Sequence, residues 1–325
     1  MSDKKILVVF GATGNQGGSV IDSILNDSTT AAQFEIVGVT RDPSKPAAVA
    51  LAARVRLCHL LRSDLLTHYL QADLDDKESL QSVVKNAYAV FAVTNWQEVM
   101  NKEREIQQGK NIADVAKEFN VQHLIWSSLP NVSKISNKKY TKVLHFDSKA
   151  VVEEYIRSLG IPATFLHLGI FMNFLFSNIV PTSEGTKSYN LAFPFPPGTK
   201  IPLISVNKDT GAYVKHILLN RETFLGRQVS AAEKEYAPTE IVSILKNVGD
   251  VDISLHANYT EDDFKKRLTA LGVPEFFQED LAENMKFIHE FGFFGGLKLD
   301  NDILPEPLET FEEFVAKSSE IAALT

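Results

Sequence analysis

The sequence predicts an α/β protein with a doubly wound parallel sheet of the Rossmann type and a smaller α+β C-terminal region. Short β-branched apolar runs alternate with longer helical patterns in the first half of the chain. The first of these runs leads into a glycine-rich turn, and the character of the sequence changes after Leu168. Strands that are buried on both faces and separated by helices are typical of parallel sheets. We therefore expect a first domain over residues 1–168 and a smaller domain over residues 169–325, interwoven with the carboxyl edge of the sheet.

Six strands and four helices are expected in the first half of the chain. The strands are short runs rich in β-branched and aromatic residues, and the helices repeat apolar residues every three or four positions. The expected strands cover residues 6–10, 35–40, 69–72, 87–93, 123–127 and 164–168. The expected helices cover residues 16–25, 76–86, 103–119 and 145–159. Residues 47–70 exceed the length of one crossover helix, and we interpret them as a longer helix with a loop insertion.

The C-terminal region begins with a strand-to-helix pattern over residues 164–180 and continues through Pro-rich turns at residues 193–198. Helix starts follow at Asp209 and near Pro238. A helix over residues 279–291 and the aromatic run 291–296 are candidates for moving or partner-facing parts, with core packing as the simpler interpretation.

The composition excludes several classes of protein. The formal net charge of −8 argues against direct binding of a nucleic-acid backbone, which needs a basic patch. Cys58 is the only cysteine, so neither an intrachain disulfide nor a cysteine zinc cluster can form, and no metal site is expected. The most apolar window, residues 164–180, is interrupted by polar side chains, which argues against a membrane span. The N-terminus shows no secretory signal. We expect a cytoplasmic protein, with access to the nucleus as an alternative.

The strongest motif is ILVVFGATGNQGGSV, residues 6–20. Gly11, Gly14 and Gly17 follow an apolar strand, with two residues between each pair, and a helical pattern begins at the same place. Glycines in such a turn let backbone N–H groups approach a pyrophosphate, and the N-terminus of the helix adds partial positive charge. A plain strand–helix turn is the alternative. Because strand, turn and helix agree, the motif predicts dinucleotide binding by the first domain.

The end of the second strand bears on the choice between NADP and NAD. An acidic residue at this place binds the 2′-hydroxyl of NAD, whereas a basic residue accommodates the 2′-phosphate of NADP. The residue is Arg41, whose planar guanidinium suits a phosphate, and Lys45 lies four positions further on. Asp42 could serve a ribose hydroxyl instead, and Arg41 could be a solvated strand-end residue. The pattern favours NADP(H), with NAD as the alternative.

The ends of the next two strands carry further polar candidates. Asp73 could accept a hydrogen bond from the adenine amino group, although a helix N-cap at Asp75 or Asp76 explains the acidic run as well. Thr94 and Asn95 place small polar groups at the predicted cofactor crevice, with a strand-end cap as the alternative.

These motifs together resemble the NmrA-like branch of the atypical short-chain dehydrogenase/reductase superfamily. The matching stretches are VVFGATGNQGGSV, VTRDPSKPA, QADLDD, VTNW, HFDSKAVVEEYIRSLGIPATFL and GIFMNFL, in the order of the family. They span roughly residues 4–180, and KIPLISVNKDTGAYVKHIL is a looser match further on. The resemblance implies a reductase-like fold that serves in NADP-sensing regulators of partner proteins, transcription factors among them. Relatives with reductase or quinone oxidoreductase activity also exist.

The resemblance also implies a set of cofactor contacts. The pyrophosphate would be lined by Gly11, Ala12, Thr13, Gly14, Asn15 and Gln16. Arg41 and Lys45 would meet the 2′-phosphate, Asp73 and Leu74 the adenine, and Val93, Thr94 and Asn95 the ribose. Lys149 would bond the nicotinamide ribose, and Phe171, Met172 and Asn173 would flank the nicotinamide. The chain departs from the family at this last segment, where it reads FMNF in place of FMEN-like residues.

His145 decides between two classes of function. In active short-chain dehydrogenases a tyrosine four residues before the lysine transfers the proton, and here His145 takes that place before Lys149. His145 could act as an acid, or it could be a helix-start residue that touches the backbone or a neighbour. The adjacent Glu153 and Glu154 are interpreted as a solvated helix face.

The leading hypothesis is therefore a binding module in which the difference in affinity for NADP, NADPH or NAD shifts affinity for a protein partner. The alternative is an NADP-dependent reductase of a quinone or other small carbonyl-type acceptor, with an apolar pocket formed by the Pro-rich loop and a helix over residues 170–180.

Overall fold

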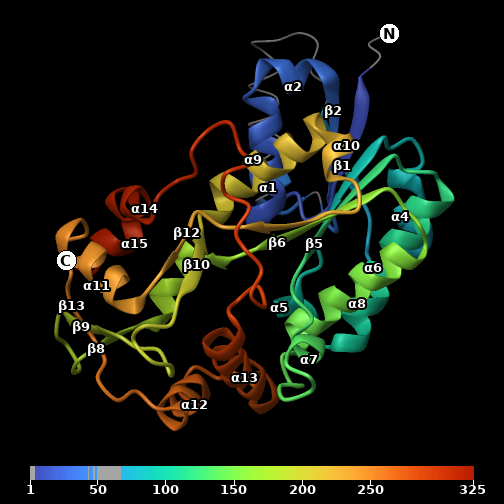
Figure 1. Cartoon of the computed structure of the whole chain (residues 1–325). Coiled ribbons are helices and arrows are strands. Elements are labelled where there is room, and N and C mark those ends of the chain that lie inside the picture. Colours follow the sequence, from blue (N-terminus) through green and yellow to red (C-terminus); the bar gives the residue numbers. More distant parts are fainter. Residues whose placement is uncertain (1–3, 43, 47, 50–66) are drawn as a thin grey trace. The chain divides into compact units, whose positions relative to one another are not determined.

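The chain is seen here as a computed structural model that describes residues 4–325 apart from 43, 47 and 50–66 (Figure 1). Cys58 and most of the predicted insertion over residues 47–70 lie outside the described residues. The chain forms two compact units, and each is assembled from separate segments. The first unit comprises Met1–Leu129, Ser148–His167 and Val206–Val229. The second comprises Pro130–Asp147, Leu168–Ser205 and Ser230–Thr325. The domain boundary predicted at residue 168 stays a prediction.

A seven-stranded sheet forms the centre of the first unit, in the order β11-β6-β5-β4-β1-β2-β3. Its strands are β1 (Lys5–Val9), β2 (Phe34–Thr40), β3 (Thr67–Gln71), β4 (Ala89–Ala92), β5 (His123–Ser128), β6 (Ala163–Leu168) and β11 (Gln228–Ala231). The pairs from β3 through β6 are all parallel, which confirms the predicted fold class. Strand order reverses between β1 and β4, so the carboxyl ends of these two strands flank the switch point where ligands bind in open α/β sheets.

Helices cover both faces of this sheet (Figure 1). One face carries α4 (Lys77–Val84), α6 (Lys102–Glu118) and α8 (Leu144–Ser158), which belongs to the first unit from Ser148 onward. The other carries α1 (Asn15–Leu25) and α9 (Val206–Leu219), which pack so closely that a Cβ at Gly211 would lie 2.1 Å from the carbonyl oxygen of Ser19. The first unit also contains α2 (Ser28–Gln33), α5 (Trp96–Val99) and α10 (Arg221–Phe224). The helix predicted to start at Asp209 begins one turn earlier, at Val206.

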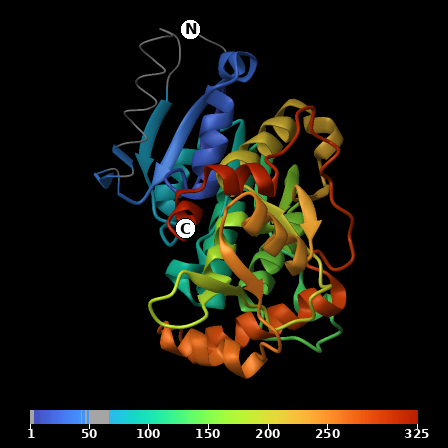
Figure 2. The same ribbon diagram turned by 90° about the vertical axis from the view of Figure 1, so that its left-hand side faces the viewer.

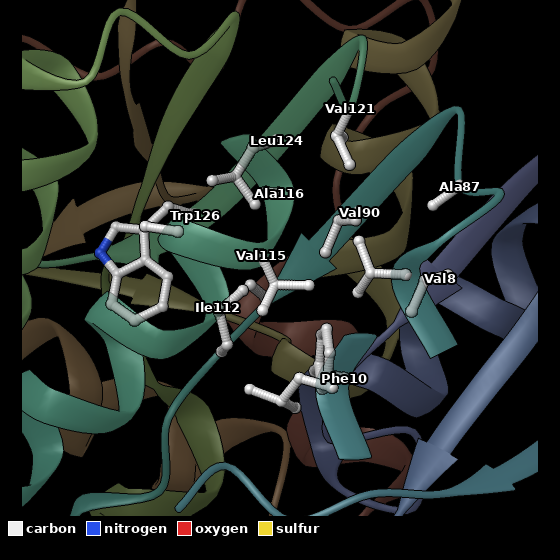
Figure 3. Close-up of a cluster of buried hydrophobic side chains, with 14 of the residues drawn as sticks. Val8, Phe10, Ala87, Val90, Ile112, Val115, Ala116, Val121, Leu124 and Trp126 are labelled. Carbon is white, nitrogen blue, oxygen red and sulfur yellow. The ribbon is translucent and has the colours of Figure 1, made fainter. Parts of the chain in front are cut away.

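The core of the first unit lies between the sheet and the layer of α4, α6 and α8 (Figure 3). Trp126 on β5 is fully buried there, and its indole Nε1 donates to the carbonyl oxygen of Lys149 at 3.1 Å. A Cβ at Gly109 on α6 would lie 2.5 Å from a methyl group of Val152, so glycine lets α6 and α8 approach each other. This packing fixes the helix that carries Lys149 against the strand next to β4.

His123 lies at the start of β5 with its imidazole buried in the same unit. Its Nε2 is 2.8 Å from the hydroxyl oxygen of Thr164, and that hydroxyl donates to the carbonyl oxygen of Phe224. Nε2 must therefore carry the proton, and Nδ1 has no hydrogen-bond partner among the described residues. Burial, with repulsion from Arg221, lowers the pKa of His123 to about 4 from its usual 6.5.

This pKa predicts that acid destabilises the protein through His123. Below pH 6.5 the imidazole of His123 binds a proton in the unfolded chain but stays neutral in the folded chain. The stability that the neutral His123 contributes above pH 6.5 is therefore lost as the pH falls towards 4. We expect a loss of about 2 kcal/mol between pH 7 and pH 5. Denaturant unfolding at both pH values measures it. The variant His123→Asn should lack this part of the loss, and equal pH dependence in the two proteins would contradict the prediction.

The second unit is an α+β arrangement with two small sheets, ordered β12-β10-β7 and β13-β9-β8. The strands are β7 (Ile170–Phe171), β8 (Ile179–Pro181), β9 (Ser188–Leu191), β10 (Ile201–Ile204), β12 (Lys234–Tyr236) and β13 (Asp252–Leu255). The helices are α7 (Val132–Ile135), the 3₁₀ helix η1 (Met172–Asn178), α11 (Pro238–Asn247), α12 (Glu261–Ala270), α13 (Glu275–Phe291), α14 (Phe311–Lys317) and α15 (Ser319–Ala322). Figure 2 shows α12 and α13 side by side. No described helix is both long enough and apolar enough to cross a membrane.

Two predictions for this unit have clear outcomes. The α-helix expected over residues 170–180 is wrong, because the segment forms β7, the 3₁₀ helix η1 and the start of β8. Its aromatic residues and asparagines have low helix propensity, which is consistent with the short irregular elements. Phe293 and Phe294 in the aromatic run 291–296 are buried, so the simpler interpretation of these two residues as core is confirmed.

Candidate functional site

The turn between β1 and α1 requires glycine at two positions. Gly11 has a φ of +63°, in the left-handed region that glycine adopts without strain. Gly17 lies so close to the turn that a Cβ there would be 2.3 Å from the carbonyl oxygen of Gly11. Val93, at the end of β4, packs against the same turn, with a methyl group 2.9 Å from the place of a Gly11 Cβ. The backbone of Gly11 and Gly14 is thus exposed at the switch point of the sheet.

The first turn of α1 offers hydrogen-bonding groups that suit an anion. Gly14 is the N-cap and provides no side chain to satisfy the first N–H groups of the helix. The Oε1 atom of Gln16 is buried and has no hydrogen-bond partner among the described residues. A flipped amide would put the Nε2 donor of Gln16 in that place. These residues therefore fit the pyrophosphate of a dinucleotide, which would accept from backbone N–H groups at the positive end of the helix. Of the other predicted pyrophosphate residues, Ala12 is buried, and Thr13 and Asn15 are exposed.

Arg41 lies at the end of β2 and is already paired. Its guanidinium makes a short contact with the carboxylate of Glu98, and 52% of its side chain is exposed. Asp42 accepts from the backbone N–H and the hydroxyl of Ser44, and these two bonds hold its pKa below the usual value. Lys45 is exposed. A phosphate at this strand end would therefore compete with Glu98 for Arg41.

The acidic run after β3 divides into separate roles. Asp76 caps α4 by accepting from the N–H groups of Glu78 and Ser79, which confirms the helix-cap interpretation at this position. Asp75 binds Arg104 at 2.6 Å. The exposed Asp73 accepts from the N–H of Asp75 at 3.0 Å. The neighbouring Leu74 is half-buried against the core cluster.

The end of β4 and α8 come together in a buried polar network. The ammonium of Lys149 donates to the carbonyl oxygen of Thr94 at 3.1 Å and to its hydroxyl at 2.8 Å. Its third partner is Oε1 of Glu105, also at 2.8 Å. The other carboxylate oxygen of Glu105 makes a short hydrogen bond with the hydroxyl of Ser148. Asn95, next along the chain, is exposed and is the N-cap residue of α5.

Glu105 is ionised in this network. Burial alone would raise its pKa, because water no longer stabilises the charge. The charge of Lys149 and the hydrogen bonds that Lys149, Ser148 and Thr94 donate to the carboxylate together outweigh that effect, so the pKa of Glu105 lies below its usual value. Glu105 and Lys149 therefore form a buried ion pair at the carboxyl end of the sheet.

Glu105 belongs to this network although no sequence motif names it. A signal was present, because Glu105 falls on the same helical stripe as Gly109, Ile112 and Ala116, all of which are buried. An acidic residue on the apolar face of a helix needs a partner.

His145 is held by residues of the second unit. Its Nδ1 makes a short contact with Asp280, whose side chain is fully buried. The same carboxylate accepts from the backbone N–H groups of Leu144 and His145 at the start of α8. Asn284 places its amide nitrogen 3.4 Å from Nε2. His145 is thus a helix-start residue that contacts a neighbour, as one of the two interpretations predicted.

The remaining predicted cofactor residues also belong to the second unit. Phe171 ends β7 and is half-buried, while Met172 is fully buried and Asn173 exposed at the start of η1. The Pro-rich loop lines a pocket of about 550 Å³ within this unit, opposite Leu255 to Tyr259. Residues 170–180 are not among the lining residues of this pocket, so an apolar pocket formed by that segment and the loop stays a prediction.

Glu153 requires a correction. The prediction that Glu153 lies on a solvated helix face is wrong, because its side chain is buried and its carboxylate binds His167 at 2.8 Å and Arg157 at 2.8 Å. The helical spacing that put Glu153 beside Glu154 could not reveal that α8 turns this position towards β6, where His167 lies.

Comparisons with known proteins agree with this architecture. The model of the NmrA-like family matches residues 2–315. An NmrA-like family domain-containing protein of Dictyostelium discoideum is 27% identical over 323 residues, which cover 97% of either chain. The structure of NmrA, a negative transcriptional regulator in complex with NADP, superposes with a TM-score of 0.75 at 20% identity and covers 97% of this chain and 95% of its own. The NADPH-dependent quinone oxidoreductase QOR2 of Escherichia coli, complexed with NADPH, gives 0.72 at 22% identity and covers 95% of this chain and 98% of its own.

Proposed function

The chain belongs to the NmrA-like family, as its motifs predicted, and from this premise we propose that it is an NADP(H)-binding regulatory protein. In this proposal the state of the bound nucleotide controls the affinity for a protein partner, with transcriptional regulation as one such role. This proposal depends on one observation. The chain keeps the glycine turn and Lys149 of the dehydrogenase site, but it has no tyrosine four residues before the lysine. We place the protein in the cytoplasm, with the nucleus as the alternative, and without direct contact to nucleic acid.

The first unit supports the binding of a dinucleotide. The glycine turn leaves backbone N–H groups uncovered at the start of α1, and an added Cβ at Gly17 would close this space. Lys149 is fixed at the end of β4, where the resemblance puts the nicotinamide ribose. Similarity to NmrA in complex with NADP and to QOR2 in complex with NADPH also favours this ligand class. NADP(H) is the proposed cofactor because Arg41 and Lys45 follow β2, and NAD is the alternative.

The surroundings of His145 support a regulator over a dehydrogenase. Nδ1 of His145 contacts the buried carboxylate of Asp280, and Nε2 lies 3.4 Å from the amide nitrogen of Asn284. Both ring nitrogens therefore have partners within the second unit, and a reacting carbonyl would have to compete with them. In an active short-chain dehydrogenase the group at this place gives its proton to the substrate.

A sensor of this kind makes a direct physical prediction. A nucleotide can shift a conformational balance only by its difference in affinity between the two conformations. We expect hydrogen–deuterium exchange of the full chain to differ between NADP⁺ and NADPH in segments outside the glycine turn. Identical exchange maps for the two saturated complexes would contradict the regulatory role while leaving nucleotide binding intact.

Arg41 provides a test of the preference for NADP(H). Arg41→Ala should raise the Kd for NADPH at least about tenfold and change the Kd for NADH little, because only NADPH carries the 2′-phosphate. Glu98→Gln removes the carboxylate that competes with the phosphate for Arg41. This variant should lower the Kd for NADPH by roughly a factor of a few. Titration calorimetry of both nucleotides measures these changes. Equal losses for NADPH and NADH in Arg41→Ala would show that Arg41 does not read the phosphate.

A reductase is the second candidate function. The site keeps the lysine and the glycine turn, and some acceptors take a hydride without a strong acid. The similar structure of QOR2 belongs to a quinone oxidoreductase, so a quinone or another small carbonyl-type acceptor is the substrate class to test.

A further inference from the structure

We propose that Glu105 sets the relative affinity of the site for oxidised and reduced nucleotide by cancelling the charge of Lys149. The inference rests on the proposed function, because it takes Lys149 to lie beside the nicotinamide ribose. It adds a residue of α6 that binds no nucleotide itself and acts through Lys149.

The geometry holds the two charges together. The side chain of Glu105 is 1% exposed and that of Lys149 11%, and 2.8 Å separates Oε1 from Nζ. An ammonium has three N–H groups, and those of Lys149 are matched by Glu105 and by the hydroxyl and carbonyl oxygens of Thr94. Ser148 fixes the second carboxylate oxygen of Glu105. Neither charge can move away from the other without breaking buried hydrogen bonds.

The charge of this pair matters because the two nucleotide states differ by one charge at the nicotinamide. The oxidised ring is positive and the reduced ring is neutral. A lone buried ammonium nearby would repel the oxidised ring and leave the reduced ring nearly unaffected. The carboxylate of Glu105 offsets that repulsion, so the pair presents a net charge of zero to the ring. Removing the carboxylate charge should therefore weaken binding of NADP⁺ selectively.

A purely structural role for Glu105 predicts a different result. If Glu105 only orders α6, α8 and the end of β4, its replacement should raise the Kd for NADP⁺ and the Kd for NADPH by the same factor. The ratio of the two dissociation constants separates these explanations, because any general loss of order cancels in it.

The decisive variant is Glu105→Gln, which keeps the size of the side chain and an oxygen that can accept from Lys149. The Kd values for NADP⁺ and NADPH are measured by titration calorimetry at pH 7, with folding checked by circular dichroism. We expect the ratio of the Kd for NADP⁺ to the Kd for NADPH to rise about tenfold. The matched variant Glu105→Gln/Lys149→Met has no charge at either position and should return the ratio close to that of the native chain.

Two results would overturn the inference: an unchanged ratio in folded Glu105→Gln, or a raised ratio that persists in the double variant. Should Glu105→Gln fail to fold, Lys149→Gln is the alternative test. This variant removes the ammonium and leaves the carboxylate of Glu105, so the ratio of the Kd for NADP⁺ to the Kd for NADPH should fall. A ratio that does not fall would overturn the inference. If the native chain binds neither nucleotide, the proposed function fails, and this outcome is distinct from an unchanged ratio.

Discussion

Replacing Gly17 by alanine is expected to abolish useful nucleotide binding. A Cβ at this position would lie 2.3 Å from the carbonyl oxygen and 2.6 Å from the carbonyl carbon of Gly11, and 2.9 Å from the backbone nitrogen of Ala12. Every one of these atoms is backbone, so the turn itself must open. We expect the Kd for NADPH to rise at least about a hundredfold, and the free energy of unfolding to fall by about 2–4 kcal/mol. Calorimetric titration and denaturant unfolding measure the two effects.

Gly18 is the matched control for this change. It is the next residue of the same helix, and within the described part of the chain a Cβ there would meet only the carbonyl oxygen of Ala12, at 3.7 Å. Gly18→Ala should bind NADPH with a Kd close to the native value and gain up to about 1 kcal/mol from the better helix propensity of alanine. Native-like binding by Gly17→Ala would show that the nucleotide does not use this turn.

Replacing Lys149 by methionine should be the most destabilising change in the network. It leaves the carboxylate of Glu105 buried, with Thr94 and Ser148 as its remaining hydrogen-bond donors and no cation. Breaking a buried ion pair by removing one partner costs about 3–5 kcal/mol. We expect a loss of that size in the free energy of unfolding by urea, together with weaker binding of NADPH, because the end of β4 loses the ammonium that orders it.

The double variant Glu105→Gln/Lys149→Met distinguishes a lost partner from lost packing. Because a buried ion pair replaced by neutral groups of similar volume is often as stable as the pair, most of the lost stability should return. Binding of NADPH should stay weak, since Lys149 is still absent. Equal destabilisation of the single and double variants would mean that packing, and not the unpaired carboxylate, sets the cost.

The regular first half of the fold could be predicted because its signals are local. Consecutive residues contain the whole signal for the strand near residues 6–10 and for the helix near residues 16–25, and the structure has β1 and α1 there. The glycine spacing is local in the same way. The α-helix predicted over residues 170–180 is wrong because an apolar aromatic run of that length is compatible with several short elements. Tertiary packing decides which of them forms.

The partners of the site residues could not be predicted, because they come from distant segments. Lys149 meets Glu105 from 44 positions earlier in the chain, and His145 meets Asp280 from 135 positions later. Arg41 meets Glu98 on α5. A single sequence identifies a residue that carries charge and the face on which it lies, but not the residue that neutralises it.

The helix that carries both His145 and Lys149 shows why this matters for function. The two residues are four positions apart and share a helical face, on which His145 takes the place of the proton-donating tyrosine. Their partners separate them: Asp280 holds His145, whereas Glu105 and Thr94 hold Lys149. The lysine is thus fixed at the end of β4 within the first unit, and the histidine is a helix-start residue held within the second unit.

The most direct test is NADPH oxidation under saturating nucleotide, followed by absorbance with a panel of quinones, aldehydes and enones. A regulator without the proton-donating tyrosine should bind NADPH at one equivalent per chain and oxidise it no faster than the buffer control with every acceptor. Robust turnover that falls in both Lys149→Ala and His145→Phe would contradict the regulatory function and establish the chain as a reductase.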